Sequence, residues 1–200
     1  MKIAIIDYGM GNLKSVYKAF LSLGLEAVVT SDAKEILKAD KVVLPGVGAF
    51  KDAMAELTKS GLLDAIYETV EKGKPFLGIC LGMQLLFDKS YEYGEVEGLK
   101  LLRGEIVKLD VPLKVPHMGW NTLAITKRDP LFTDIADNSY VYFVHSYYLE
   151  TAEDIVSSYT TYGKEIAVSV QKDNIFGAQF HPEKSGDIGL QMLRNFGGIK

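Results

Sequence analysis

The chain has 200 residues, of which 48% are apolar and 24% charged, and its formal net charge is −4. This length suits one well-buried core and is short for two, so we expect a single domain spanning residues 1–200. The charges are scattered and form no basic run, which argues against nucleic acid as a partner.

The location expected from the sequence is the cytoplasm. The single cysteine cannot form an intrachain disulfide, which suits a reducing compartment. The apolar run at residues 3–6 ends at Asp7 and is too short for the core of a signal peptide. No stretch approaches the roughly 18 apolar residues that span a bilayer, so we expect no membrane association.

The first half of the chain alternates strand-like and helix-like patterns. Apolar runs predict strands at 3–6, 27–29, 42–44 and 76–79, the third of them ended by Pro45. Helical spacing predicts helices at 13–23, after Asp32, through 53–57 and 62–70, and at 81–87. Asp32 with Glu35 forms a possible capping box. This alternation predicts an α/β fold with a mostly parallel central sheet covered by helices on both faces.

The second half is richer in strands. Strand-like segments lie at 120–125, 140–148, 155–160, 166–170 and 175–180, before a final helix at 188–196. Short turns bearing Gly163 and Asp173-Asn174 join the last three strands, which indicates antiparallel hairpins. We therefore expect an antiparallel β extension of the parallel sheet.

Cys80 is the candidate nucleophile. It lies between the fourth predicted strand and the following helix, at the edge of a parallel sheet where ligands bind. Gly78 and Gly82 flank it in the G-x-nucleophile-x-G pattern of a tight strand-to-helix elbow. The helix N-terminus would favour the thiolate. The alternative is that Cys80 is a small buried apolar residue, the usual role of a free cysteine.

His181 and Glu183 are the candidate partners of Cys80. Residues two apart in an extended chain point to the same side, and Pro182 stiffens the backbone between them. The carboxylate can then orient the imidazole, as in a Ser-His-Asp triad. The alternative reading of His-Pro-Glu is a surface turn.

Backbone N–H groups near Cys80 are expected to stabilise an oxyanion. The amide of Leu81 is one candidate, and the string PGVG at 45–48 supplies the second. Gly46 and Gly48 allow a peptide there to turn its N–H inward, or to flip when substrate arrives.

No cofactor or metal is expected. Gly9 and Gly11 resemble the start of a dinucleotide fingerprint, but Lys14 stands where the third glycine belongs. No phosphate-binding loop of the G-x-x-x-x-G-K-[S/T] kind occurs, and the three histidines lack metal-ligand spacing.

The strings PGVG, GICLGMQ and QFHPEKSG, in this order and spacing, resemble the class I, triad-type glutamine amidotransferases. Within that class the chain is similar to the glutaminase subunits of imidazole glycerol phosphate synthase. The narrower resemblance rests on DYGMGN (7–12), PHMGWN (116–121), YFVHSYY (142–148) and the Lys-Ser-Gly tail at 184–186. The resemblance extends from about residue 2 to residue 196.

This resemblance implies glutamine hydrolysis through a γ-glutamyl thioester on Cys80, without a cofactor. The ammonia would pass to a (β/α)₈-barrel cyclase subunit that makes imidazole glycerol phosphate and aminoimidazole carboxamide ribonucleotide in histidine biosynthesis. By motif, the resemblance implies an oxyanion side formed by Gly46, Val47 and Gly48. The glutamine head group would be held by Gln84 and by the backbone of His145, Ser146 and Tyr147.

Ammonia in neutral water is mostly protonated and no longer nucleophilic, so its transfer requires a shielded path into a partner. We expect a docking face from the 8–12 loop and the PHMGWN segment, with these residues: Tyr8, Asn12, His117, Met118, Trp120 and Asn121. Trp120 is the candidate anchor, and the alternative is that it fills the core. We also expect the isolated chain to be nearly inactive, because the PGVG peptide points the wrong way until the complex is loaded.

Two other functions are compatible with the fold. One is a glutaminase that serves another synthase, against which the PHMGWN string and the Lys-Ser-Gly tail argue. The other is a non-catalytic regulatory module, against which the retention of Cys80, His181 and Glu183 argues.

Overall fold

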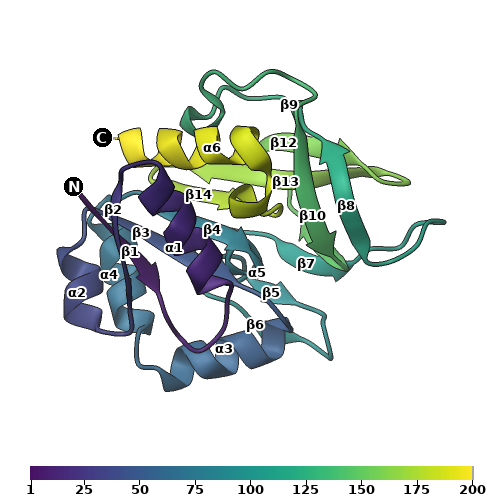
Figure 1. Ribbon diagram of the computed structural model, residues 1–200. Helices are drawn as coiled ribbons and strands as arrows, with labels where there is room; N and C mark the ends of the chain where they lie inside the picture. The colour runs from purple at the N-terminus through teal and green to yellow at the C-terminus, as the bar shows by residue number, and fades with distance from the viewer. Residues whose placement is uncertain (200) are drawn as a thin grey trace.

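A computed structural model describes residues 1–199, and its centre is a mixed sheet flanked by helices (Figure 1). The parallel part of this sheet contains, in spatial order, β2 (Glu26–Thr30), β1 (Lys2–Ile6), β3 (Lys41–Gly46), β4 (Phe76–Cys80) and β14 (Ile175–Ala178). The carboxyl ends of these strands meet at one edge, where ligands bind in open parallel sheets.

Helices cover both faces of the parallel part. One face carries α1 (Leu13–Ser22) and α6 (Gly186–Gly198), and the other carries α2 (Ala33–Lys38), α3 (Phe50–Lys59) and α4 (Leu63–Glu71). In β1, Ile3 and Ile5 pack with α1 and α6, whereas Ala4 and Ile6 pack in the opposite cluster. This alternation follows from the two-residue period of a strand and explains why the run is apolar throughout.

The antiparallel extension continues the same sheet. From β14 it runs through β13 (Glu165–Lys172), β11 (Tyr147–Glu150), β7 (Glu105–Lys108), β5 (Lys89–Ser90) and β6 (Val96–Glu97). Each neighbouring pair is antiparallel except β7 with β5, which is parallel. β12 (Val156–Thr161) also pairs with β13, and β9 (Ala124–Ile125) pairs with the other side of β12. A separate ribbon pairs β8 (His117–Thr122) with β10 (Tyr140–His145), and two 3₁₀ turns span Pro130–Phe132 and Pro182–Lys184.

The predicted fold class is confirmed. The hairpins expected at Gly163 and at Asp173-Asn174 connect β12 to β13 and β13 to β14, all antiparallel. β14 then returns parallel to β4, which brings the segment after β14 beside the end of β4. No helix within residues 1–199 is long and apolar enough to cross a bilayer.

Two predicted boundaries in the first half are wrong. β3 continues through Pro45 to Gly46, because its ladder with β1 ends at Val43 and the proline therefore lies beyond the positions that need an N–H toward β1. The helix expected at 81–87 is only α5 (Leu81–Gln84). The carbonyls of residues 85–87 instead accept from backbone N–H groups of residues 99–102.

The predicted capping box is half correct. Asp32 accepts from the N–H of Lys34 at 2.8 Å and caps α2. Glu35 does not return to the cap, because its carboxylate pairs with Lys2 Nζ at 2.8 Å.

The strands expected at 120–125 and 140–148 are each broken. The first divides into β8 and β9, and the second divides into β10 and β11 at Ser146. The chain changes sheets at Ser146, since β10 pairs with β8 whereas β11 pairs with β7 and β13. This break places residues 144–147 over the carboxyl end of β4.

Candidate active site

Cys80 occupies a tight elbow between β4 and α5, with φ 54° and ψ −113°. Such a conformation is strained for a residue with a side chain and is typical of functional sites. A Cβ on Gly78 would lie 2.7 Å from the carbonyl oxygen of Gly82, and one on Gly82 would lie 1.8 Å from that of Leu44. The two flanking glycines are therefore required by close backbone packing, as the pattern predicted.

Gly46 has a different place from the one expected. It pairs with Cys80 in the β3–β4 register, and a Cβ there would lie 2.8 Å from the N–H nitrogen of Gly82. It packs behind the elbow and does not line the pocket, whereas Val47 and Gly48 do. Gly46 thus allows β3 to approach the elbow closely.

His181 and Glu183 lie together in the interior, just beyond the end of β14. Nδ1 of His181 is 2.8 Å from Oε1 of Glu183, and both side chains are almost fully buried. Ser185 holds this turn in place: its hydroxyl donates to the His181 carbonyl at 2.6 Å and accepts from the N–H of Tyr142 at 2.9 Å. The His-Pro-Glu string is therefore a buried turn and not a surface turn.

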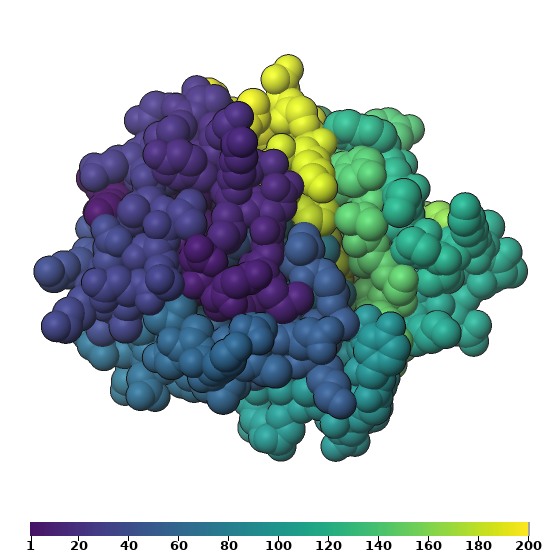
Figure 2. All heavy atoms as spheres, turned by 60° about the horizontal axis from the view of Figure 1, so that its bottom comes forward, coloured from purple at the N-terminus to yellow at the C-terminus, as the bar shows by residue number. Residues whose placement is uncertain are grey.

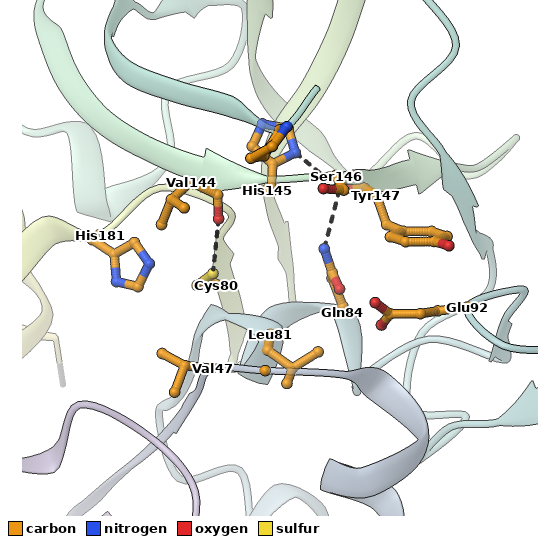
Figure 3. A pocket seen from close by; sticks show the side chains of 12 residues that line it. Val47, Cys80, Leu81, Gln84, Glu92, Val144, His145, Ser146, Tyr147 and His181 are labelled. Carbon is orange, nitrogen blue, oxygen red and sulfur yellow. Dashed lines mark hydrogen bonds between the residues drawn. The ribbon is translucent and has the colours of Figure 1, made fainter. Parts of the chain in front are cut away.

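The other ring nitrogen of His181 is available for chemistry. Its Nε2 is buried and has no hydrogen-bond partner among residues 1–199, and the ring faces the same pocket as the Cys80 sulfur (Figure 3). Burial lowers the pKa of His181, but the nearby Cys80 sulfur and Glu183 carboxylate outweigh this effect and raise the pKa to about 10. An imidazolium here can stabilise a thiolate and donate a proton to a leaving amine.

The sulfur has two further polar neighbours. Cys80 Sγ lies 3.9 Å from the carbonyl oxygen of Val144, and Nε2 of Gln179 donates to Sγ at 3.8 Å. Gln179 is buried and was missed in the sequence, although it precedes His181 by two residues in a strand-like segment. The spacing that joined His181 to Glu183 also places Gln179 on the same side.

A pocket of about 280 Å³ opens beside the sulfur. Cys80 and His181 lie at one end, Glu92 and Tyr147 lie at the other, and Gln84 lies between them (Figure 3). Most residues expected to bind substrate line it: Val47, Gly48, Leu81, Gln84, His145, Ser146 and Tyr147. Three further lining residues were not among the predicted site residues: Glu92, Pro116 and Val144, of which the last two lie in the PHMGWN and YFVHSYY strings.

The Gln84 side chain is held in one orientation. Its Nε2 donates to the Tyr147 carbonyl at 3.2 Å and to Oε1 of Gln179 at 2.8 Å, so its own oxygen remains as an acceptor. The Tyr147 carbonyl also accepts from Nδ1 of His145 at 2.9 Å. Both lone pairs of this carbonyl are therefore engaged, and it positions Gln84 instead of offering a free acceptor to a ligand.

Glu92 supplies a carboxylate at the far end of the pocket. It lies in the turn between β5 and β6, and its Oε2 accepts from the N–H of Phe50 at 2.7 Å, at the N-terminus of α3. The N-terminus of that helix carries partial positive charge, which attracts the side chain. The arrangement fits a ligand that carries an ammonium group opposite its reacting end.

The residues expected at a docking face divide into three groups: exposed, buried and half-buried. Met118 and Trp120 on β8 are 62% and 55% exposed, so Trp120 is a surface residue and does not fill the core. Tyr8 and His117 are buried, and direct contact with a partner is not available to their side chains. The Tyr8 hydroxyl packs against Gly46 behind the elbow, and the His117 ring stacks against Phe143.

Asn12 and Asn121 are half-buried. Asn121 uses its amide internally, donating to the Thr161 carbonyl at 2.9 Å. Trp120 packs edge-on against Tyr142, with ring centroids 6.0 Å apart, and the Lys184 ammonium lies 6.0 Å from the centroid of Tyr142. The exposed aromatic surface of β8 therefore continues onto β10 and toward the His-Pro-Glu turn.

Comparisons with known proteins agree with this geometry. The family described as "Glutamine amidotransferase class-I" matches residues 4–198. Solved structures of similar fold include a glutamine amidotransferase (TM-score 0.76, 18% identity, 98% of this chain and 99% of the other covered) and PurLQS from Thermotoga maritima (TM-score 0.75, 19% identity, 98% and 96% covered).

Two curated relatives are much more similar in sequence, and both are named imidazole glycerol phosphate synthase subunit HisH. The one from Caldanaerobacter subterraneus subsp. tengcongensis is 56% identical over 196 residues, 98% of this chain and 97% of that protein. The one from Geobacter sulfurreducens is 50% identical over 207 residues, 100% and 99%. The chain therefore belongs to the class I glutamine amidotransferase family and, within it, to the HisH subunits of imidazole glycerol phosphate synthase.

Proposed function

We propose that this chain is a glutaminase that hydrolyses L-glutamine to L-glutamate and ammonia, with Cys80 as nucleophile. His181 acts as acid and base, and Glu183 orients its ring. The observation that carries this proposal is that the sulfur and the imidazole share one pocket, with the imidazole fixed from behind by a carboxylate at 2.8 Å.

The reaction takes place at the end of the pocket that holds Cys80 and His181. The Cys80 thiolate attacks the side-chain amide carbon, and the negative charge that develops on the amide oxygen is met by N–H groups near Val47, Gly48 and Leu81. The His181 imidazolium then protonates the leaving nitrogen, and ammonia departs from the thioester. Water, giving its proton to His181, attacks the thioester carbon and releases glutamate with the thiolate restored.

The head group of glutamine has matching partners at the opposite end. Its ammonium group would pair with the Glu92 carboxylate, and the free oxygen of Gln84 would accept a further N–H. This pose places the side-chain amide next to Cys80, since Gln84 lies between the two ends (Figure 3).

The partner we propose is the (β/α)₈-barrel cyclase subunit of imidazole glycerol phosphate synthase. The relatives are named as subunits of that enzyme, and ammonia must be delivered before it is protonated. The products would be imidazole glycerol phosphate and aminoimidazole carboxamide ribonucleotide, in cytoplasmic histidine biosynthesis. No cofactor is needed for these steps.

The docking face we propose combines the loop between β1 and α1 with the exposed side chains of β8. The N-terminal segment (purple) and the strands of the second half (green) reach one face of the molecule, with the C-terminal helix (yellow) between them (Figure 2). Trp120 and Met118 supply the exposed apolar area, and Asn12 lies in the loop. A large exposed aromatic side chain is a common anchor of protein interfaces.

A glutaminase assay of the wild type and Cys80→Ser tests this function, with and without the cyclase subunit and its nucleotide ligand. We expect ammonia release by the wild-type complex, little by the isolated chain, and none by Cys80→Ser. Turnover that survives alkylation of Cys80 would exclude this mechanism, whereas absence of turnover by the wild-type complex would favour a non-catalytic module. Loss of the gene should cause histidine auxotrophy; a different auxotrophy would assign the chain to another synthase.

A further inference from the structure

Two buried histidines outside the Cys80–His181–Glu183 site link the pocket to strand β8: His145 lines the pocket, and His117 belongs to β8. His145 ends β10, His117 begins β8, and the two residues are opposite one another in the antiparallel ribbon. Nδ1 of His117 is 3.0 Å from Nε2 of His145. The His117 ring is stacked between Phe143 and Tyr162, with centroid distances of 4.7 and 4.0 Å.

The protonation of this pair is fixed by its neighbours, beginning at Asn121. The Asn121 amide oxygen accepts from the N–H of Thr122 at 2.8 Å, and its Nδ2 donates to the Thr161 carbonyl at 2.9 Å. These two bonds determine which end of the amide is nitrogen. The second hydrogen of Nδ2 then faces Nε2 of His117 at 3.3 Å, so that ring nitrogen must be an unprotonated acceptor.

The hydrogen positions of both rings, from His117 to the pocket, follow from this acceptor. With Nε2 unprotonated, His117 carries its hydrogen on Nδ1 and donates to Nε2 of His145. His145 in turn carries its hydrogen on Nδ1 and donates to the Tyr147 carbonyl at 2.9 Å. Both rings are therefore neutral and Nδ1-protonated, because an added proton would set one N–H against another. Burial acts in the same direction and lowers the pKa of each ring to about 4.

The Tyr147 carbonyl connects the histidines to the nucleophile. It accepts from Gln84, whose other N–H reaches Gln179, and Gln179 donates to the Cys80 sulfur. Each N–H group from Asn121 to Gln84 has one acceptor, so the donor and the acceptor of every hydrogen bond between these residues are determined. The orientation of the Gln84 amide depends on a carbonyl that His145 holds from the other side.

We propose that His117 and His145 are positioning residues of the glutamine pocket: a pair of neutral imidazoles that fixes the Tyr147 carbonyl and, through it, the Gln84 amide. This inference rests on the proposed glutaminase function. It concerns substrate binding, because the pair touches neither the sulfur nor the His181 ring. Because His117 belongs to β8, the His117–His145 and His145–Tyr147 hydrogen bonds connect this exposed strand to the pocket.

The test compares three variants in the complex with the cyclase subunit. His117→Phe keeps an aromatic ring between Phe143 and Tyr162 but leaves His145 without its donor, so the Nδ1–H form of His145 is no longer enforced. We expect the KM for glutamine to rise about tenfold, as for loss of a hydrogen bond in a buried polar site, with kcat changed much less. His117→Asn restores a donor near the Nδ1 position and should recover most of the KM. Tyr162→Leu removes the stacking ring, together with a hydroxyl that donates to the Lys114 carbonyl at 2.6 Å, but keeps the His117–His145 bond, and it should leave KM unchanged.

Nitrogen-15 NMR of the wild-type imidazoles gives a second readout that does not depend on whether the variants fold. Both rings should be neutral and carry the hydrogen on Nδ1 at neutral pH. An Nε2–H or doubly protonated ring would overturn the inference, as would a His117→Phe enzyme with wild-type KM. A rise in KM equal in His117→Phe and Tyr162→Leu would also overturn it, because packing alone would explain the effect. Absence of glutamine hydrolysis in the wild-type complex would instead defeat the proposed function.

Discussion

The imidazole of His181 and the carboxylate of Glu183 are joined through Nδ1 and Oε1, 2.8 Å apart, with the opposite ring nitrogen left toward the pocket. The carboxylate determines which nitrogen carries the hydrogen when the ring is neutral, and it stabilises the ring when charged. Because both side chains are buried, solvent cannot replace either partner.

Glu183→Gln should therefore lower kcat for glutamine hydrolysis by about 10²- to 10⁴-fold, with a much smaller effect on KM. The amide keeps the shape of the carboxylate but can hold the ring in the wrong tautomer and cannot balance its charge. The matched control is Glu153→Gln, which alters a surface ion pair with Lys172 and should leave kcat unchanged. Steady-state ammonia release by the complex is the measurement, and a loss below about tenfold would contradict the assigned role.

Glu92→Gln should raise the KM for glutamine about 10- to 100-fold, the range expected for a lost hydrogen bond to a charged group. Glutaramate, which is glutamine without its amino group, should be hydrolysed equally by variant and wild type, because it has no ammonium to pair. Glu95→Gln is the control, since Glu95 lies in the same turn, is exposed and does not line the pocket. Equal effects on the two substrates would show that Glu92 acts by another route.

Trp120→Ala should weaken binding of the cyclase subunit by about 2 kcal/mol, roughly thirtyfold in Kd, if its ring is buried on docking. The free energy of unfolding of the isolated chain should change little, because the side chain is already more than half exposed. Leu21→Ala removes an exposed apolar side chain at the far end of α1 and should leave Kd unchanged. Titration calorimetry gives the Kd, and full-strength binding by Trp120→Ala would exclude the anchor role.

The elements that the sequence predicted well are those whose signals are local. The alternation of apolar runs and helical spacing located the strands of the parallel sheet, and Gly78 and Gly82 located the elbow. The pairing of His181 with Glu183 was also predicted, although from an extended chain, whereas the structure forms it in a 3₁₀ turn at Pro182–Lys184. These features depend on neighbours within a few positions, and tertiary packing did not override them.

The features that were missed depend on contacts between distant segments. The break at Ser146 follows from β10 and β11 joining different sheets, and nothing in the local string marks it. Glu92 enters the pocket from a turn that is placed by β5, β6 and the N-terminus of α3. Tyr8 and His117 lie in segments predicted to form a docking surface, yet their side chains are buried.

Gly82→Ala should destabilise the fold by about 3 kcal/mol or more, because the new Cβ would lie 1.8 Å from a backbone oxygen of Leu44 that cannot move aside. Activity should fall as well, since the elbow sets the position of Cys80. Gly198→Ala is the matched control: it lies at the end of α6 and its Cβ would meet nothing within 4 Å. Urea denaturation of both variants is the measurement. Similar midpoints would show that the elbow tolerates a side chain.

The pH dependence of stability should have two limbs with different histidines responsible for each. The folded pKa of His117 and His145 is about 4, below the usual 6.5, so the unfolded chain binds more protons between these values. The free energy of unfolding should therefore fall as pH drops from about 6.5 toward 4, by up to about 1.4 kcal/mol per pH unit for each ring. Below about pH 6 the buried Asp129 carboxyl offsets the contribution of one ring, because burial raises its pKa to about 6.

His181 has the opposite sign, because its folded pKa of about 10 lies above the usual 6.5. Its contribution is fully present below about pH 6.5 and is lost as pH rises through 10. Urea denaturation across this range measures both limbs. His117→Phe should make the acid limb shallower, because only His145 then contributes, and leave the alkaline limb unchanged, whereas His181→Gln should remove the alkaline contribution and leave the acid limb unchanged. An acid limb that persists undiminished in His117→Phe would mean that other groups cause it, because a phenyl ring has no proton to bind.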